Sequence, residues 1–504
     1  GFMHMGAIFS ALVSERLAHQ TGGVFFLRIE DTDKKREVVG AIDVIVNSLK
    51  NYGLTPDEGE VEIGKEIGAY GPYKQSLRGD IYAIYAKKLV EEGKAYPAFD
   101  TEEELEKMSN EQRETKIRPG YRGSWAVWRD KSEEEILEAL NSGKKFVIRL
   151  KATGDFEKKM KCSDMIRGER EFSENDIDTV LLKTDGMPTY HFAHVVDDYL
   201  MGTTDVLRAD EWLASLTLHL ELWEKLGWTA PRYGHFAPIQ KIDEGSRRKL
   251  SKRKDPEANI VFFEEAGYPQ VAVIEYLLNL ANSSFEDWRK AHPTTDYKEF
   301  PFYIGRMNVS GALFDINKLN DISKNVIGRM NVQEVYEKAL AWAEKNDKHL
   351  YDRLSKNPKY SLAVFGIERG GAESRKDISS WGALRGELGY FFDDIFSAEP
   401  LDEKLLAPLE VSHIKAAVSA FLGGYDEKDN KDIWFGKIKK IATELGFAES
   451  TKAYKIESTK YKGTVADVAK IFRVLLTGKT KTPDLYEIMQ VMGKERVVAR
   501  LNNF

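Results

Sequence analysis

The chain has 504 residues, of which 42% are hydrophobic and 31% charged, and its 74 basic and 81 acidic residues leave a formal net charge of −7. Its single cysteine, Cys162, excludes an internal disulfide bond and any zinc site built from several cysteines. No apolar run approaches the roughly 20 residues needed to cross a bilayer. We therefore expect a cytoplasmic protein without a membrane partner, folded into roughly three to five domains.

The chain opens on GFMHMGAIFSALVSERL, where His4 lies between Gly1 and Gly6 and an apolar run with helical spacing follows. This pattern predicts a tight turn that leads into the N-terminus of a helix. Such a terminus presents unpaired backbone N–H groups and attracts phosphate. An ordinary surface histidine on a loop is the alternative. Because a phosphate-binding turn normally follows a strand, we also expect a strand before Gly1.

Helix and strand patterns then alternate. Gly22 and Gly23 end the first helix, and the run Val24–Ile29 predicts a buried strand, as in a parallel α/β unit. Residues 80–185 change character, with acidic helices (TEEELEKM, SEEEILEAL) and a strand at KKFVIRL, which indicates an insertion. Strand-like residues return in TYHFAHVVDDYLMG and TDVLRADEW, and a helix follows. Beyond about residue 320 amphipathic helices predominate.

Two motifs fail on inspection. LLTGKTK ends like a P-loop, but the glycine that this motif needs five residues before Gly478 is replaced by Arg473. His191 and His194 have the spacing of metal ligands, yet they lie in an apolar, strand-like segment without nearby cysteines. A structural or substrate-contact role is therefore favoured for both, and we predict no metal site formed by the protein.

The segment RRKLSKRKD is more informative. Lys249 and Lys252 bracket Ser251 in a polar loop that follows Gly245. Clustered ammonium groups suit a polyphosphate whose charge must be neutralised during a reaction. Taken alone, however, the segment is more typical of a solvated basic loop.

Together the two motifs resemble a known pair. GFMHMGA resembles the HIGH signature of class I aminoacyl-tRNA synthetases, and KLSKR resembles their KMSKS signature. Between and after them, LRIEDTD, DGMPTYHFAHVVDDYLMGTTDVLRADEW and LLTGKTKTPDLYEIMQVMGKERVVARL are similar to bacterial glutamyl-tRNA synthetases. Each signature is weak alone, but their order and spacing over nearly the whole chain make the resemblance specific.

The resemblance implies an α/β Rossmann-like class I catalytic domain with an inserted α/β domain, followed by an all-α anticodon-binding region. The expected ranges are catalytic half 1 (1–79), acceptor-end-binding insertion (80–187), catalytic half 2 (188–235), stem-contact domain with the KLSKR loop (236–320), and helical anticodon-binding subdomains 1 (321–385) and 2 (386–504).

The implied reaction is ATP-dependent ligation of L-glutamate to the 3′ end of tRNA(Glu), with tRNA(Gln) left open as a further substrate. The expected ATP-binding residues are His4, Gly6, Glu211, Lys249, Leu250, Ser251, Lys252 and Arg253, of which His4, Gly6, Lys249 and Lys252 are the expected catalytic residues. The resemblance also implies a glutamate site in which Glu30 orients the ammonium group and Arg36 and Arg208 face carboxylates, beside Tyr190 and His194.

Some positions depart from the family pattern. Ala7 stands where the signature has its second histidine, and His194 stands where some relatives carry asparagine. Relatives that bind zinc use cysteines near the segment AYPAFDT, where this chain has none, so we expect no structural zinc. ATP with Mg²⁺ is expected as a substrate, and the protein is expected to be a monomer.

Other functions remain as alternatives. Glutaminyl-tRNA synthetases have a β-barrel anticodon region, whereas this one is predicted to be helical, and a glutamyl-queuosine tRNA synthetase would lack the C-terminal helices. A nucleotide-dependent oxidoreductase is disfavoured because no G-x-G-x-x-G follows a strand. A non-catalytic RNA-binding relative would be expected to have lost His4 or Lys252, and both are present.

Overall fold

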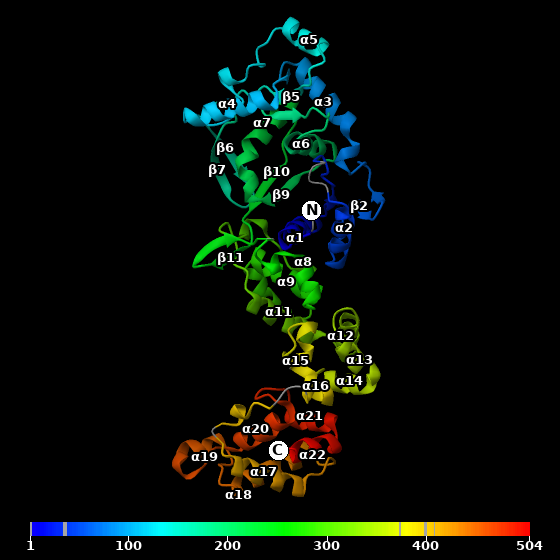
Figure 1. Ribbon diagram of the computed structural model, residues 1–504, viewed down its shortest axis with the longest axis vertical. Helices are drawn as coiled ribbons and strands as arrows, with labels where there is room; N and C mark the ends of the chain where they lie inside the picture. Colours follow the sequence, from blue (N-terminus) through cyan, green and yellow to red (C-terminus); the bar gives the residue numbers. More distant parts are fainter. Residues whose placement is uncertain (1–2, 34–37, 252, 372–373, 398–400, 408) are drawn as a thin grey trace. The chain divides into compact units, whose positions relative to one another are not determined.

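The structure, a computed structural model, describes residues 3–33, 38–251, 253–371, 374–397, 401–407 and 409–504 (Figure 1). The chain divides into two units. The first contains Gly1–Ile260 and Leu277–Asp315, and the second contains Val261–Tyr276 and Ile316–Phe504. In the described ranges, no helix is long and apolar enough to cross a membrane.

The predicted N-terminal helix is α1 (Met5–Gln20), which starts directly after the extended backbone of His4. Its apolar face packs against β9, and Gly22 ends it at a φ of +67°, a conformation that glycine adopts without strain. The strand that follows covers only Phe26–Leu27, which is shorter than the predicted run Val24–Ile29. Ile29 instead forms an isolated bridge with Lys74.

The described strands form four sheets, in the orders β1-β2-β3, β4-β5-β8, β7-β6-β10-β9 and β11-β12. The pairs β1/β2, β6/β10 and β9/β10 are parallel, as an α/β fold requires. The strands are β1 (Phe26–Leu27), β2 (Glu58–Glu62), β3 (Lys65–Ile67), β4 (Ala95–Ala98), β5 (Val147–Leu150), β6 (Lys159–Asp164), β7 (Gly168–Ser173), β8 (Val180–Leu182), β9 (Asp205–Ala209), β10 (Arg232–Phe236), β11 (Gln240–Asp243) and β12 (Ser246–Lys249).

Helices pack against strands of three of these sheets. The two acidic helices predicted in the insertion, α4 and α5, are present, and each starts with a capping box, formed by Thr101 with Glu104 and by Ser132 with Glu135. The helices that follow α1 up to residue 291 are α2 (Ala41–Asn51), α3 (Gly79–Glu91), α4 (Glu102–Glu114), α5 (Glu133–Asn141), α6 (Tyr190–Leu200), α7 (Leu216–Leu226), α8 (Ile260–Glu265), α9 (Gln270–Ala281) and α10 (Ser284–Ala291).

The range 80–187 is divided between two sheets. Its strands β4, β5 and β8 form a sheet of their own, whereas the hairpin of β6 and β7 joins β10 of the sheet that carries Arg208. The chain therefore leaves the three-stranded sheet after β5 and returns to it at β8. The change in composition along the sequence indicates the insertion, but it does not indicate that β6 and β7 join a different sheet.

The prediction of a strand in TYHFAHVVDDYLMG is wrong, because Tyr190–Leu200 forms the helix α6. Most of this helix is buried all round, so its apolar residues run together instead of recurring on one face. Periodicity alone does not separate such a buried helix from a buried strand. The strand predicted in TDVLRADEW is β9, and the helix predicted after it is α7.

The second unit is helical, as predicted for the region beyond about residue 320. All secondary structure named between residues 316 and 504 of the described ranges is helix, around one large apolar core. Gly478 ends α20 instead of opening a helix, which agrees with the rejection of a P-loop there. The α-helices are α11 (Ile316–Arg329), α12 (Val332–Asn346), α13 (Lys348–Lys356), α14 (Pro358–Gly366), α15 (Leu384–Leu388), α16 (Asp393–Phe396), α17 (Val411–Gly424), α18 (Lys431–Glu444), α19 (Thr451–Ile456), α20 (Val465–Thr477), α21 (Leu485–Met492) and α22 (Lys494–Asn502).

Candidate active site

The N-terminal turn holds His4 at the start of α1. The His4 carbonyl accepts the amides of Ala7 and Ile8, which fixes the first turn of the helix. A Cβ atom built on Gly6 would lie 3.2 Å from His4 Nδ1, so a larger residue would press on the imidazole. His4 also forms a backbone bridge with Asn259, four residues after the lysine segment ends at Asp255. The fold therefore brings the two sequence motifs close to each other.

The lysine segment begins as a strand, not a loop. Residues Ser246–Lys249 form β12, which pairs with β11 through a turn in which Glu244 and Gly245 both have positive φ. Lys249 Nζ pairs with the carboxylate of Glu211, in the 3-10 helix η4 (Asp210–Ser215) after β9. Both side chains are 56% exposed, so this pair adds little stability but leaves two predicted ATP-binding residues side by side.

Asp255, which sequence reasoning missed, organises the end of the lysine segment. Its carboxylate accepts two hydrogen bonds from Arg248, at 2.6 and 2.9 Å, and one from the Ser251 amide at 2.7 Å. The bonds from Arg248 hold the pKa of the Asp255 carboxyl well below its usual range. Leu250 donates its amide to Ile239, whereas Lys252 lies outside the described residues.

A second group of predicted residues surrounds Arg208, which lies on β9 and is 7% exposed. Its Nη1 donates to the Tyr190 hydroxyl at 3.4 Å, and the Tyr190 ring stacks on His194 with centroids 5.6 Å apart. Burial raises the pKa of Tyr190 to about 12, and the charge of Glu30 acts in the same direction. Arg36 lies outside the described residues.

Glu30 is connected to the same site through Arg28. The Glu30 carboxylate is 3.4 Å from Arg28, and Arg28 donates to Asp198 at 2.7 Å. Asp198 in turn bonds His194 Nδ1 at 2.7 Å. Burial alone would raise the pKa of the Asp198 carboxyl, but the bonds and charges of Arg28 and His194 hold that pKa below its usual range. The Glu30 side chain remains 40% exposed, so it is free to meet a solvent-borne ligand.

Arg208 also contacts two histidines that sequence reasoning missed. His235 lies opposite Arg208 in the β9/β10 register, and its Nε2 accepts from Arg208 Nε at 3.0 Å. His219, on α7, lies 3.0 Å from Arg208 Nη2 through its Nδ1. Both histidines are fully buried. The available signal was a lone histidine inside each of two apolar runs, LTLHLELW and RYGHFAP.

His191 and His194, the pair with the spacing of metal ligands, make separate contacts. The residues lie three apart on α6 but bond to different partners, His219 and Asp198. Among the described residues, no group of three or more histidine, cysteine, aspartate or glutamate side chains has an arrangement suited to hold a metal ion.

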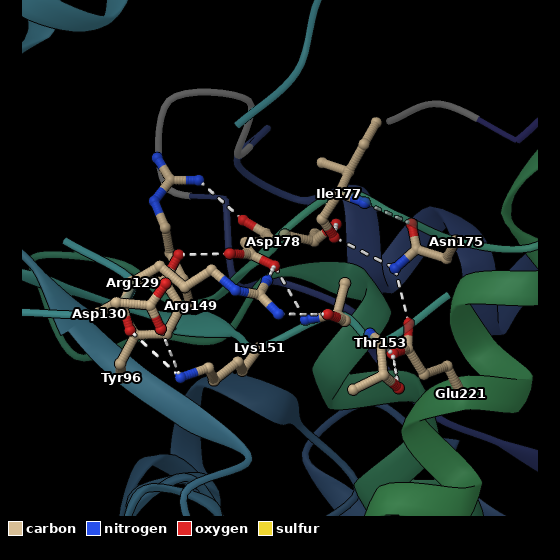
Figure 2. A network of polar contacts seen from close by, with 12 residues as sticks. Tyr96, Arg129, Asp130, Arg149, Lys151, Thr153, Asn175, Ile177, Asp178 and Glu221 are labelled. Carbon is tan, nitrogen blue, oxygen red and sulfur yellow. Dashed lines mark hydrogen bonds and ion pairs between the residues drawn. The ribbon is translucent and has the colours of Figure 1, made fainter. Parts of the chain in front are cut away.

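The insertion has a polar core of its own, drawn in Figure 2. Asp178 is fully buried and accepts hydrogen bonds from Tyr96, Arg129 and the Ala152 amide. Nearby, Glu221 of α7 accepts the Thr153 amide and the Asn175 side chain, each at 2.8 Å. Thr153 and Asn175 lie on the two segments that connect the three-stranded sheet to the β6–β7 hairpin.

A cavity of about 710 Å³ lies beside α4 in this part of the chain. Aromatic rings of Trp125 and Trp128 line it together with Lys144 and Lys145, but so do acidic residues of α4. Its wall is therefore mixed in charge, and it includes none of the predicted site residues.

Comparison with known proteins identifies the family of this chain. Residues 1–320 match the family model described as "tRNA synthetases class I (E and Q), catalytic domain", and residues 448–504 match "Anticodon binding domain". The chain belongs to this class I tRNA synthetase family.

Relatives of this synthetase-family chain match it along almost its whole length. A protein named glutamate–tRNA ligase from Clostridium perfringens (strain SM101 / Type A) is 47% identical, with 100% of this chain and 92% of the relative covered. One of the same name from Sorangium cellulosum is 43% identical, covering 100% and 93%. The crystal structure of a glutamate tRNA ligase from Elizabethkingia meningosepticum, in complex with its amino acid, has 27% identity and a TM-score of 0.77, covering 100% and 96%.

Proposed function

We propose that this protein is a glutamate–tRNA ligase that activates L-glutamate with Mg-ATP and transfers it to tRNA(Glu). The observation that carries the proposal is Arg208, a buried guanidinium whose described partners are all neutral. An arginine in this state favours a ligand carboxylate. The family and the names of its relatives agree with glutamate as that ligand.

The reaction has two steps. An oxygen of the glutamate α-carboxylate attacks the α-phosphorus of ATP, and pyrophosphate leaves with the electrons of the broken P–O bond. The 2′-hydroxyl of the terminal adenosine then attacks the acyl carbon of the adenylate, loses its proton and releases AMP. Neither step needs a covalent enzyme intermediate, so the chain contributes mainly by positioning and charge stabilisation.

The ATP side of the site is assigned to the turn at His4 and to the lysine segment. The N-terminus of α1 provides backbone N–H groups for a phosphate oxygen. Lys249 pairs with the exposed carboxylate of Glu211 near the end of β9, and it can leave this carboxylate to bind a phosphate of ATP. Lys252 is assigned to stabilise the negative charge that develops on the leaving pyrophosphate. This role stays a prediction because the residue lies outside the described ranges.

The glutamate side of the site is assigned to the residues around Arg208. Arg208 takes a carboxylate, Tyr190 lies beside it, and Glu30 takes the ammonium group of the amino acid. Glutamine has a neutral amide in place of the side-chain carboxylate, so it would leave the Arg208 charge without a counterion. An unpaired buried charge is costly, which favours glutamate over glutamine.

The RNA partner is assigned from the second unit. The described part of residues 316–504 is helical, as expected for glutamate enzymes and not for the β-barrel of glutaminyl-tRNA synthetases. Residues 448–504 carry the anticodon-binding match and the exposed basic stretch STKAYKIESTKYKG. We assign this region to the tRNA, with the protein acting as a monomer.

The test measures pyrophosphate exchange with each amino acid in turn, with tRNA present, followed by charging of purified tRNA(Glu) and tRNA(Gln). The expected result is exchange with glutamate alone and charging of tRNA(Glu). Charging of tRNA(Gln) as well would extend the substrate range, while exchange with glutamine in preference to glutamate would refute the proposal.

A further inference from the structure

The histidines around Arg208 form one continuous chain of hydrogen bonds. Asp164 Oδ2 lies 2.6 Å from His235 Nδ1, and His235 Nε2 accepts from Arg208. On the other side, His219 Nδ1 lies 3.0 Å from Arg208, and His219 Nε2 lies 2.9 Å from His191 Nδ1. The chain thus runs from β6 through β10 and β9 to α7 and α6.

These contacts fix the tautomers. Asp164 accepts the proton of His235 Nδ1, so His235 Nε2 keeps its lone pair for the Arg208 Nε–H. An arginine only donates, so His219 Nδ1 also presents a lone pair and carries its proton on Nε2. Burial lowers the pKa of His219 and of His235, which favours these neutral forms.

Neutral partners leave the charge of Arg208 intact. Three of its N–H groups donate to His235, His219 and Tyr190, and among the described contacts two remain. Two N–H groups are what a carboxylate takes from an arginine in a bidentate pair. A carboxylate at either histidine position would hold Arg208 equally well but would neutralise it before the substrate arrived.

We propose that His219, together with His235, is a positioning residue that orients Arg208 while keeping its charge uncompensated, and that this arrangement lets the pocket select an acidic amino acid over its neutral amide. The inference rests on the proposed function, since it assigns Arg208 to a substrate carboxylate.

The chain offers a matched pair of variants for the test. In His219→Asn the amide oxygen takes the place of Nδ1 and still accepts from Arg208. In His219→Asp the shape is the same but the new carboxylate pairs with Arg208. The Michaelis constants for glutamate, glutamine and ATP are measured for both variants by pyrophosphate exchange with tRNA present.

We expect His219→Asn to keep the glutamate KM within roughly tenfold of the parent value. In His219→Asp we expect it to rise by roughly 100-fold or more, with the glutamate preference over glutamine reduced and the ATP KM unchanged. If only Asn folds, His219→Leu replaces Asp, and its glutamate KM should exceed that of His219→Asn by about tenfold. A merely structural role predicts equal glutamate KM values in Asn and Asp, or in Asn and Leu, and would overturn the inference.

The unmodified enzyme separates this inference from the proposed function. If it activates glutamate and the variants do not differ, the function stands and the positioning role is refuted. If it activates another acidic amino acid, the glutamate assignment fails, and the same comparison on that substrate decides the role of His219. Activation of a neutral amino acid alone would refute both.

Discussion

Arg208 is the residue to which we assign the choice of substrate. In Arg208→Ala a ligand carboxylate loses its cation, and truncating one member of a buried charge pair typically costs about 2–5 kcal/mol. We expect kcat/KM for glutamate to fall by the corresponding factor while the ATP KM changes little. Steady-state pyrophosphate exchange measures both constants, and a thermal melt controls for folding. Unchanged glutamate kinetics in a folded variant would remove Arg208 from the pocket.

Sequence reasoning named some of the residues that lie around Arg208 and missed others. Tyr190, His194 and Arg208 belong to the segment that resembles a known family, so their relation could be predicted. His219 and His235 meet Arg208 only because β10 pairs with β9 and α7 carries His219 to within 3.0 Å of the guanidinium group. The sequence spacing of 11 and 27 residues contains no sign of that meeting. The contact of Asp164 was even harder to predict, because this residue belongs to the β6–β7 hairpin inside the predicted insertion.

The hairpin of β11 and β12 is the element that presents the lysine segment, and Asp255 is its buried anchor. Asp255→Ala leaves Arg248 and the Ser251 amide without this acceptor, which typically costs about 1–3 kcal/mol. We expect a higher ATP KM and an unchanged glutamate KM. Asp243→Ala is the matched control, because Asp243 is the exposed partner of the same arginine and should matter little. Equal ATP KM values in the two variants would contradict the anchoring role.

At the level of elements, the two acidic helices of the insertion were predicted correctly, whereas the apolar run Tyr190–Leu200 was not. The boxes at Thr101 and Ser132 fix the starts of α4 and α5 through local hydrogen bonds, and such bonds depend only on neighbours in sequence. The strand or helix state of Tyr190–Leu200 depends instead on what surrounds it. Because its neighbours α3, α7 and β8 come from elsewhere in the chain, the sequence of the segment could not decide it.

For the whole molecule, we expect the free energy of unfolding to fall on acidification, because burial lowers the pKa values of several histidines. Burial lowers the pKa of His191 to about 4, against about 6.5 for an exposed histidine. Between these values the unfolded chain binds protons that the folded chain excludes, so the free energy of unfolding decreases as the pH falls from about 6.5 towards 4. Urea titrations at pH 7.5 and 5.5 test this. His191→Gln should show a smaller loss, and an equal loss would contradict the assignment.

Binding of tRNA is predicted to depend strongly on salt, although the chain as a whole is acidic. Contacts with phosphate release counterions, so affinity falls as salt concentration rises. The exposed lysines of the basic stretch include Lys452 and Lys455. Replacing both with glutamine should reduce the slope of log K against log salt by about 2. The glutamate KM at the same salt concentrations serves as the control. An unchanged slope would show that these lysines face solvent and do not contact tRNA phosphates.

The two hydrogen bonds that Glu221 accepts from Thr153 and Asn175 limit how the insertion can be exchanged for another. The Glu221 side chain is only 11% exposed and holds both crossings between the three-stranded sheet and the β6–β7 hairpin, through Thr153 and Asn175. An insertion of different sequence would need donors equivalent to the Thr153 amide and the Asn175 side chain. Without them, the nearly buried Glu221 carboxylate would lack these two hydrogen bonds. Because Glu221 lies outside the range 80–187, recombination at those sequence boundaries would break both hydrogen bonds unless equivalent donors were kept.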